Sequence, residues 1–362
     1  MSRAAPAAEP LPSGFAQALI RWQRAHGRSG LPWQGTRDPY VVWLSEIMLQ
    51  QTQVSAVVPY FHRFLQRFPD VHALAAASED EVLSLWSGLG YYSRARNLQR
   101  CAQLVVQEHA GEFPRSVEGL AKLPGIGQTT AAAIAAFCFG EKVSILDGNV
   151  RRVLTRLMAF GGDQSNVAAQ RALWNLAQKL VPADPLGDDM TAYTQGLMDL
   201  GATVCTRTRP KCLHCPVCEM CEARKSGTQA QFPVKTGRTL KRHESWWLLL
   251  VRRQHPSGQA QWWLERRSAN GIWAGLYCPP VYGSETALNS TLERSLLDQQ
   301  LTACEAITHQ LTHRELRLQP MLLDLPATST LSSFQENGRW ALASELGDLG
   351  LPAPIRPLLA GL

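Results

Sequence analysis

The sequence lacks any long apolar run, and this absence limits where the protein can reside. No stretch of about 18 uncharged apolar residues is present, so the sequence predicts no membrane-spanning helix. Residues Met1–Pro12 are rich in alanine and proline and hold no apolar segment of the kind found in secretory signal peptides. We therefore expect residues 1–14 to form a disordered tail. We expect the protein to be cytoplasmic, and associated with the nucleoid if its source is bacterial.

Charge is also sparse. Charged residues make up 18% of the 362 residues and hydrophobic residues 45%, which is typical of globular chains with sizeable cores. This length suits two domains better than one. The net charge of +6 is compatible with a polyanionic partner but does not require one.

The periodicity of apolar residues is helical from Phe15 to about Ala223. Asp38 and Pro39 form a good helix start, and Pro59 predicts a kink or break in the helical stretch that follows. Further helices are predicted at Glu79–Trp86, Ser93–His109, Gly127–Phe139, Gly148–Ala159, Ala168–Leu180 and Met190–Leu200.

The pattern changes after a basic segment at residues 232–243. The periodicity then falls to two, as in strands, with one further helix predicted at Ser284–Gln300. The predicted strands are Trp246–Val251, Gln261–Glu265, Leu316–Leu322 and Gly338–Ala341. The sequence thus predicts a multidomain protein, with an all-α domain at residues 15–231, a linker at 232–243 and an α+β domain at 244–362.

Five of the nine cysteines lie within 17 positions. Without an export signal a disulfide framework is not expected, and this crowding indicates a metal site. Cys205, Cys212, Cys215 and Cys221 lie in one loop that suits a [4Fe–4S] cluster, although zinc also accepts four thiolates. Cys218 extends a regularly spaced set from Cys212 to Cys221, so the sequence leaves open whether Cys205 or Cys218 is a ligand.

A glycine-rich turn, Leu123–Gly127, separates two predicted helices. Gly125 and Gly127 allow a tight turn that exposes N–H groups at the start of a helix. A phosphate group can bind there, and such a contact does not depend on the nucleotide sequence. An ordinary turn between helices is the alternative. About twenty residues later, Asp147 ends an apolar stretch and precedes a helix, as either a simple N-cap or a functional carboxylate.

These motifs together resemble the helix-hairpin-helix DNA glycosylases, which include endonuclease III. Three segments carry a narrower resemblance to the adenine DNA glycosylase (MutY) family: Trp43–Val54, Gly88–Asn97 and Ile145–Val150. The resemblance extends from about Leu31 to Cys221. It implies a helix-hairpin-helix glycosylase fold with an iron–sulfur loop at residues 205–221.

The resemblance implies excision of adenine mispaired with 8-oxoguanine or guanine, after the base has been flipped out of double-stranded DNA. Glu46 would be the general acid that protonates adenine N7, Asp147 would stabilise an oxocarbenium-like sugar, and Asn149 would help to hold these groups. Where the related lyases have a nucleophilic lysine this chain has Thr129, which implies base excision without strong strand nicking.

The residues next to Glu46 are apolar, which predicts a raised pKa that keeps the carboxyl group protonated. A buried salt bridge of Glu46 is the alternative.

The resemblance also implies three sets of binding residues. Residues expected to wedge into or support the opposite strand are Gln50, Gln51 and Tyr91, although Tyr91 is alternatively a core aromatic. Residues expected to bind the DNA backbone are Leu123, Gly125, Gly127, Thr129 and Arg151. Residues expected to line the adenine pocket are Arg28, Leu31, Trp33 and Gln195.

The second domain resembles the Nudix-like C-terminal domain of the same family through Asn270–Pro280. The helix expected at Thr291–Asp298 lacks the glutamate-rich set that a Nudix hydrolase needs, so we expect a reader of 8-oxoguanine. Thr312 and His313 would contact that base, whereas Leu311 replaces the phenylalanine of the family.

Two other functions stay open at this point. One is an endonuclease III-like glycosylase and lyase, against which Thr129 and the second domain argue. The other is a non-catalytic iron–sulfur protein that binds DNA. In each case a monomer is expected.

Overall fold

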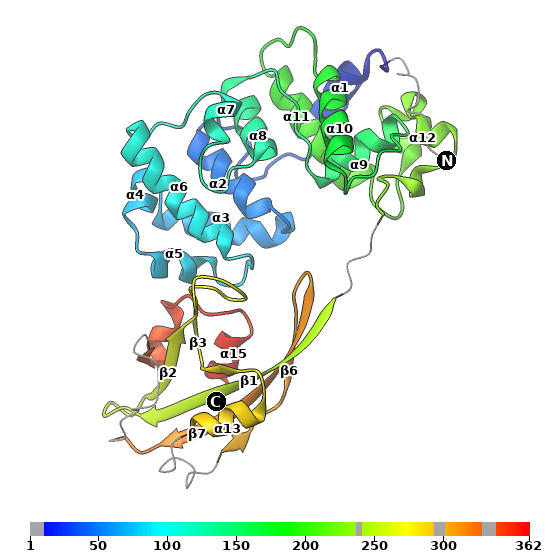
Figure 1. Ribbon diagram of the computed structural model, residues 1–362. Coiled ribbons are helices and arrows are strands. Elements are labelled where there is room, and N and C mark those ends of the chain that lie inside the picture. The colour runs from blue at the N-terminus through cyan, green and yellow to red at the C-terminus, as the bar shows by residue number, and fades with distance from the viewer. Residues whose placement is uncertain (1–10, 237–240, 293–300, 328–337) are drawn as a thin grey trace. The chain divides into compact units, whose positions relative to one another are not determined.

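The structure is a computed structural model that describes residues 11–236, 241–292, 301–327 and 338–362, and it divides into two compact units (Figure 1). The first unit comprises the chain up to His62 together with Leu104–Gly237, and the second comprises Arg63–Gln103 together with Arg238–Leu362. The second unit therefore includes a helical segment from the middle of the predicted all-α domain.

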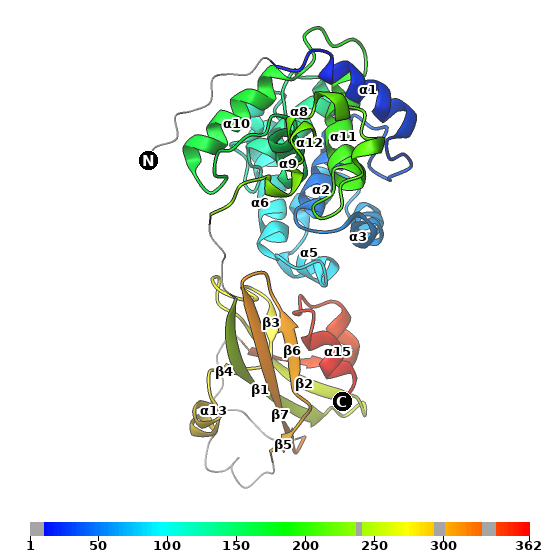
Figure 2. The same ribbon diagram turned by 90° about the vertical axis from the view of Figure 1, so that its right-hand side faces the viewer.

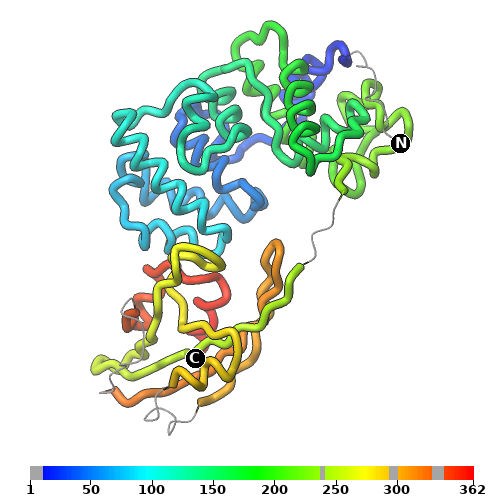
Figure 3. Tube along the Cα trace, in the orientation of Figure 1, coloured from blue at the N-terminus to red at the C-terminus, as the bar shows by residue number. Residues whose placement is uncertain are grey.

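The first unit is helical, as predicted. Its core holds small and branched apolar side chains, and α1 lies beside α11 although the two are far apart in the sequence (Figure 3). Ala131–Ala136 of α8 are all buried, and their small side chains allow close packing against α2 and α11. The helices are α1 (Phe15–His26), α2 (Pro39–Leu49), α3 (Val54–Arg67, which continues into the second unit), α7 (Val117–Leu120), α8 (Gln128–Phe139), α9 (Gly148–Leu157), α10 (Val167–Lys179), α11 (Asp189–Asp199) and α12 (Glu222–Lys225).

The helix opened by Asp38 ends earlier than Pro59. Asp38 accepts a hydrogen bond from the Tyr40 N–H at 2.9 Å, which confirms the predicted cap. The helical stretch then breaks after Leu49, because Gln51 adopts a left-handed φ of 57°. Pro59 lies inside α3, so of the kink or break predicted at this proline the break is wrong.

The second unit combines three helices from the middle of the chain with a mixed sheet. These helices are α4 (Val71–Ala76), α5 (Glu79–Trp86) and α6 (Ser93–His109, which continues into the first unit). The strands are β1 (Arg242–Gln254), β2 (Ala260–Arg266), β3 (Tyr277–Cys278), β4 (Val281–Tyr282), β5 (Thr302–Ala303), β6 (Ile307–Gln310), β7 (Arg314–Leu325) and β8 (Gly338–Leu342).

The sheet is centred on two long parallel strands. β1 pairs with β7 from Arg242↔Arg314 to Arg253↔Leu325, and the other strand pairs among the described residues, such as β6 with β7, are antiparallel (Figure 2). The α+β class predicted for this part of the chain is confirmed. α13 (Glu285–Thr291) covers only the first part of the helix predicted at Ser284–Gln300, and 293–300 fall outside the described residues. A short helix, α15 (Ile355–Ala360), follows the sheet.

Two other predictions fall partly outside the described residues. These are the tail at residues 1–14, of which 1–10 are not described, and the linker at 232–243, of which 237–240 are not described. Among the described helices, none has both the length and the apolar character needed to cross a bilayer.

Candidate active site

Glu46 lines a pocket of about 540 Å³ in the first unit. The same pocket is lined by the four residues expected to form the adenine pocket: Arg28, Leu31, Trp33 and Gln195. Glu46 lies on α2, Gln195 lies on α11, and the other three residues lie in the loop between α1 and α2. A pocket of this size lies in the range of small-molecule sites, so these segments, distant in sequence, form one cavity that can hold a base.

The pKa of Glu46 is raised to about 8. Burial is the main cause, because the apolar neighbours of Glu46 on α2, such as Trp43 and Ile47, are themselves buried, and the negative charge of Asp147 adds to it. Burial also raises the pKa of Asp147, but hydrogen bonds from backbone N–H groups and the charge of Arg152 oppose this rise. The raised pKa predicted for Glu46 is therefore confirmed, and the two carboxyl groups interact.

Asp147 is the N-cap of α9. Its Oδ1 accepts a hydrogen bond from the Val150 N–H at 2.7 Å, and the Asn149 side chain donates to its Oδ2 at 3.5 Å. The simple capping function that the sequence left open is thus present. It also fixes the orientation of the carboxylate.

Arg152 connects Asn149 to the cysteine loop. Its guanidinium donates to Asn149 Oδ1 at 2.9 Å, to the Gly201 carbonyl at 2.7 Å and to the Cys205 carbonyl at 2.8 Å. Asn149, which hydrogen-bonds to Asp147, and the first cysteine of the loop are therefore held by one side chain.

Asp199 is a site residue that the sequence analysis missed. Its carboxylate is completely buried and accepts hydrogen bonds from Arg28 Nε at 2.7 Å and from Gln195 Nε2 at 2.8 Å. Gln34 holds the same loop, because it donates to the Arg28 carbonyl and accepts from the Leu31 N–H, each at 3.1 Å. Asp199 lies near Gln195 in the sequence, but its contact with Arg28 joins residues 171 positions apart.

All five clustered cysteines line one small apolar pocket. Arg156 of α9 is buried beside it and donates hydrogen bonds to the carbonyls of Thr206, Arg207 and Gln229 at 2.7–3.0 Å and to Cys205 Sγ at 3.4 Å. Within the described ranges, no three histidine, cysteine or acidic side chains converge as they would around a single metal ion. The donor set, thiols in an apolar pocket, is one that an iron–sulfur cluster uses.

The glycine turn lies beside a second groove of the first unit. Gly125 has a φ of 78°, which favours glycine, and Gly127 is the N-cap of α8. The Gln50 side chain donates to Thr130 Oγ1 at 3.4 Å. Gln50, Gly127, Thr129 and Arg151 all line this groove. By contrast, the Leu123 side chain is buried in the core, and its carbonyl accepts from the Ile126 N–H.

The remaining expected DNA contacts are exposed. Gln51 and Tyr91 both have left-handed backbones, and Tyr91 is 42% exposed, so it is not a core aromatic. The Tyr91 hydroxyl hydrogen-bonds to Thr312 Oγ1 within the second unit. Thr312 and His313 form the tip of the β6–β7 hairpin, which the Leu311 N–H closes by donating to the Arg314 carbonyl at 2.8 Å.

Comparisons with known proteins show which families the chain is similar to. Residues 44–179 match the model of the HhH-GPD superfamily base excision DNA repair proteins, and residues 249–361 match the NUDIX domain. The chain is 33% identical over 347 residues to the adenine DNA glycosylase of Buchnera aphidicola subsp. Schizaphis graminum, covering 95% of this chain and 97% of that protein. It is 46% identical over 236 residues to the adenine DNA glycosylase of Mus musculus, covering 62% of this chain and 45% of that protein.

A solved structure of a thermostable thymine-DNA glycosylase is also similar. Its TM-score is 0.52 at 30% identity, and the match covers 59% of this chain and 95% of that chain.

Proposed function

The chain belongs to the adenine DNA glycosylases, enzymes of base excision DNA repair in the HhH-GPD superfamily, and we propose that it removes adenine mispaired with 8-oxoguanine or guanine by acid-assisted hydrolysis. The observation that carries this proposal is the raised pKa of Glu46 in a pocket that also holds Arg28, Trp33 and Gln195.

The two carboxyl groups divide the chemistry. With a pKa of about 8, Glu46 holds a proton at neutral pH and donates it to N7 of the flipped adenine, which makes the base a better leaving group. Burial raises the pKa of Asp147, but the hydrogen bond from the Val150 N–H favours its ionised form, and the negative charge of that form stabilises the positive charge that develops on the sugar. Once the base has left, the Glu46 carboxylate accepts a proton from the attacking water.

The adenine pocket is held in shape by Asp199. Because Asp199 fixes both Arg28 and Gln195, these side chains present their remaining donors and acceptors to the base in a set geometry. Leu31 and Trp33 provide apolar surface for the ring.

DNA is bound without sequence preference at the glycine turn. Gly125 and Gly127 expose N–H groups at the start of α8, and Arg151 adds positive charge to the same groove. Gln50, Gln51 and Tyr91 support the strand opposite the flipped base. Thr129 has no amine, so it cannot form the Schiff base on which a lyase depends.

Cys205, Cys212, Cys215 and Cys221 would hold a [4Fe–4S] cluster, and their ligation would cross-link the loop. Arg156 fixes the loop backbone against α9. Cys218 lines the same pocket and is the alternative ligand to Cys205.

Thr312 and His313 read the base opposite adenine, and the protein acts as a monomer. The tip of the β6–β7 hairpin presents both side chains to solvent, as a reader of DNA requires.

Incubation with a labelled duplex containing adenine opposite 8-oxoguanine tests this function. We expect abasic sites that become strand breaks only after alkali treatment. Strand scission without alkali, together with a borohydride-trapped covalent complex in high yield, would instead identify a lyase. A colourless protein that contains zinc, rather than a brown one with a broad visible absorption band, would exclude the cluster.

A further inference from the structure

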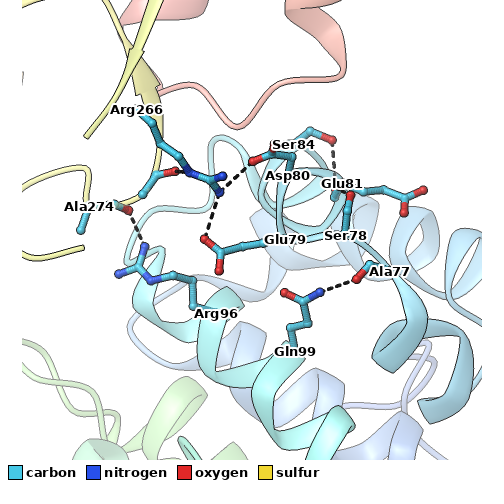
Figure 4. Close-up of polar contacts among 11 residues, drawn as sticks. Ala77, Ser78, Glu79, Asp80, Glu81, Ser84, Arg96, Gln99, Arg266 and Ala274 are labelled. Carbon is cyan, nitrogen blue, oxygen red and sulfur yellow. Dashed lines mark hydrogen bonds and ion pairs between the residues drawn. The ribbon is translucent and has the colours of Figure 1, made fainter. Parts of the chain in front are cut away.

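Two arginines join helices α5 and α6 to the segment from the end of β2 to the start of β3 in the second unit (Figure 4). Arg266, at the end of β2, donates from Nη2 to Asp80 Oδ1 at 2.9 Å and to Glu79 Oε1 at 3.2 Å. Arg96 of α6 donates to the Ala274 carbonyl. We call this set, Arg266, Glu79, Asp80, Arg96 and Ala274, the polar bridge.

The polar bridge is poorly suited to be only a stabilising contact. Arg266, Glu79 and Asp80 are each about one-third exposed, and ion pairs of this kind contribute about 0–1 kcal/mol. Two like charges also meet here: Arg266 is one cause of the lowered pKa of Arg96, although burial is the main cause and Glu79 opposes it. What such a multidentate arrangement does provide is a fixed geometry.

On the helical side, the polar bridge fixes both helices that flank Tyr91. Glu79 and Asp80 form the first turn of α5, and Arg96 lies in the first turn of α6. Arg94 also lies in the first turn of α6, and its buried guanidinium donates to the carbonyls of Leu89 and Gly90, in the turn before the helix, at 3.2 and 3.1 Å. The same guanidinium lies 5.4 Å from the Tyr91 ring centre. Tyr91 therefore lies in a turn that Arg94 holds in place. The two helices that flank this turn, α5 and α6, are connected by the polar bridge to Arg266 and Ala274.

On the sheet side, the polar bridge fixes the segment that supports the hairpin tip. Ala274 follows Trp273, whose φ of 58° is unusual for a bulky residue. The Trp273 ring is buried and lies 5.9 Å from the His309 ring, centre to centre, and 5.4 Å from the Trp246 ring. His309 belongs to β6, which leads directly to Thr312.

We propose that the polar bridge sets the position of Tyr91 relative to Thr312, which makes Arg266 and Arg96 positioning residues for discrimination of the base opposite adenine. The polar bridge and the Tyr91–Thr312 hydrogen bond both connect the α5–α6 region to the strand region, and both lie within the second unit. When the polar bridge is broken, Tyr91 and Thr312 are no longer held at a fixed separation, and the preference for 8-oxoguanine over guanine falls. This inference rests on the proposed roles of Tyr91 and Thr312.

The experiment measures single-turnover adenine excision by the full chain from duplexes with adenine opposite 8-oxoguanine and opposite guanine. For Arg266→Ala we expect the ratio of the two rates to fall about three- to tenfold, the size typical of residues that act without touching a ligand. Arg266→Lys, which keeps one charged contact, should restore part of the ratio. Glu79→Gln with Asp80→Asn should lower the ratio as Arg266→Ala does, and combining the two changes should lower it no further.

Arg339→Ala is the matched control. Arg339 pairs with Glu345 at 3.6 Å and is similarly exposed, and this ion pair of the described residues involves neither α5 nor α6. The control should keep the wild-type ratio, and thermal unfolding of every variant should show a folded protein. An unchanged ratio in both Arg266→Ala and the Glu79→Gln, Asp80→Asn variant, or an equal fall in Arg339→Ala, would overturn the inference. A wild-type protein that excises adenine from neither duplex would instead contradict the proposed function, and one that excises it at equal rates from both would contradict the proposed reading of the opposite base by Thr312 and His313.

Discussion

Glu46 holds its proton under conditions in which an exposed carboxyl group would be ionised. Its pKa is about 8, so the acid form is present at neutral pH and disappears as the pH rises through that value. We expect single-turnover adenine excision to fall about tenfold for each pH unit above about 8, because only the protonated group can act as the acid. Rate measurements between about pH 6 and pH 10 would show this. A rate that stays flat to the highest pH would exclude Glu46 as the acid.

The same burial makes Glu46 costly to the fold when it is ionised. Its pKa is about 8 in the folded chain and about 4.3 in an unfolded one. The folded state therefore binds the proton more tightly, and stability is lost as the pH rises from about 4 through about 8. We expect Glu46→Gln to be more stable than the wild type by up to about 5 kcal/mol at pH 9, with this advantage absent at pH 4.

Urea denaturation at both pH values measures this difference. The same variant should excise adenine about 100- to 10,000-fold more slowly, because its amide cannot donate the proton. Glu112→Gln, at an exposed carboxyl group, should change neither property.

Asp147 allows its two functions to be separated. Asparagine caps helices as well as aspartate does, so Asp147→Asn should keep the hydrogen bond from the Val150 N–H while losing the negative charge. We expect it to abolish adenine release with a change in unfolding free energy below about 0.5 kcal/mol, whereas Asp147→Ala should also lose about 1 kcal/mol of stability. Thermal unfolding together with an excision assay tests this. Residual activity near the wild-type level in Asp147→Asn would show that the charge is not needed.

At the scale of single residues, local sequence context predicted much of the site. Apolar neighbours together with the family resemblance predicted the raised pKa of Glu46, and the position of Asp147 before a helix indicated a cap as one of its two possible functions. Asp199 could not be found in this way, because its importance comes from a contact with Arg28 that only the folded chain creates. For Leu123, the motif did not reveal that the side chain is buried in the core.

At the scale of elements, the end of α9 and the cysteine loop depend on one side chain. Arg156 makes four hydrogen bonds to the loop and to Gln229, and a lysine in its place cannot reproduce the planar fork. We expect Arg156→Lys to lower stability by about 2–4 kcal/mol and to reduce the iron retained on purification. Iron analysis and visible absorption measure the second effect. Arg21→Lys, at an exposed position of α1, should retain the wild-type iron content.

Helices and strands were predictable because each has its own apolar period and its own cap. The break between α2 and α3 was predicted at Pro59, because a proline is a visible signal in the sequence. The actual break is at Gln51, whose left-handed backbone no residue type in the sequence announces. The parallel pairing of β1 with β7 and the assignment of α5 and α6 to the second unit depend on contacts between distant segments. No local pattern encodes such contacts.

At the scale of the whole molecule, Gly350 is a point where α5 and the C-terminal residues approach closely within the second unit. A Cβ atom at Gly350 would lie 2.7 Å from Leu83 Cβ, so Gly350→Ala forces the two segments apart. We expect this change to lower stability by about 1–3 kcal/mol and to reduce discrimination between 8-oxoguanine and guanine. Gly347→Ala is the matched control, because a Cβ there meets nothing within 4 Å. Equal melting temperatures for the two variants would contradict this account.

The second unit also has a consequence for the order of events during synthesis. Arg96 and Ala274 are separated by 178 residues along the chain, so helices α5 and α6 leave the ribosome long before their partner strands. At about 5–20 residues per second this interval lasts roughly ten seconds or more. Throughout it, the surface of α5 and α6 that later packs on the C-terminal residues is uncovered, and nascent chains stalled before residue 274 should be the ones that a chaperone binds.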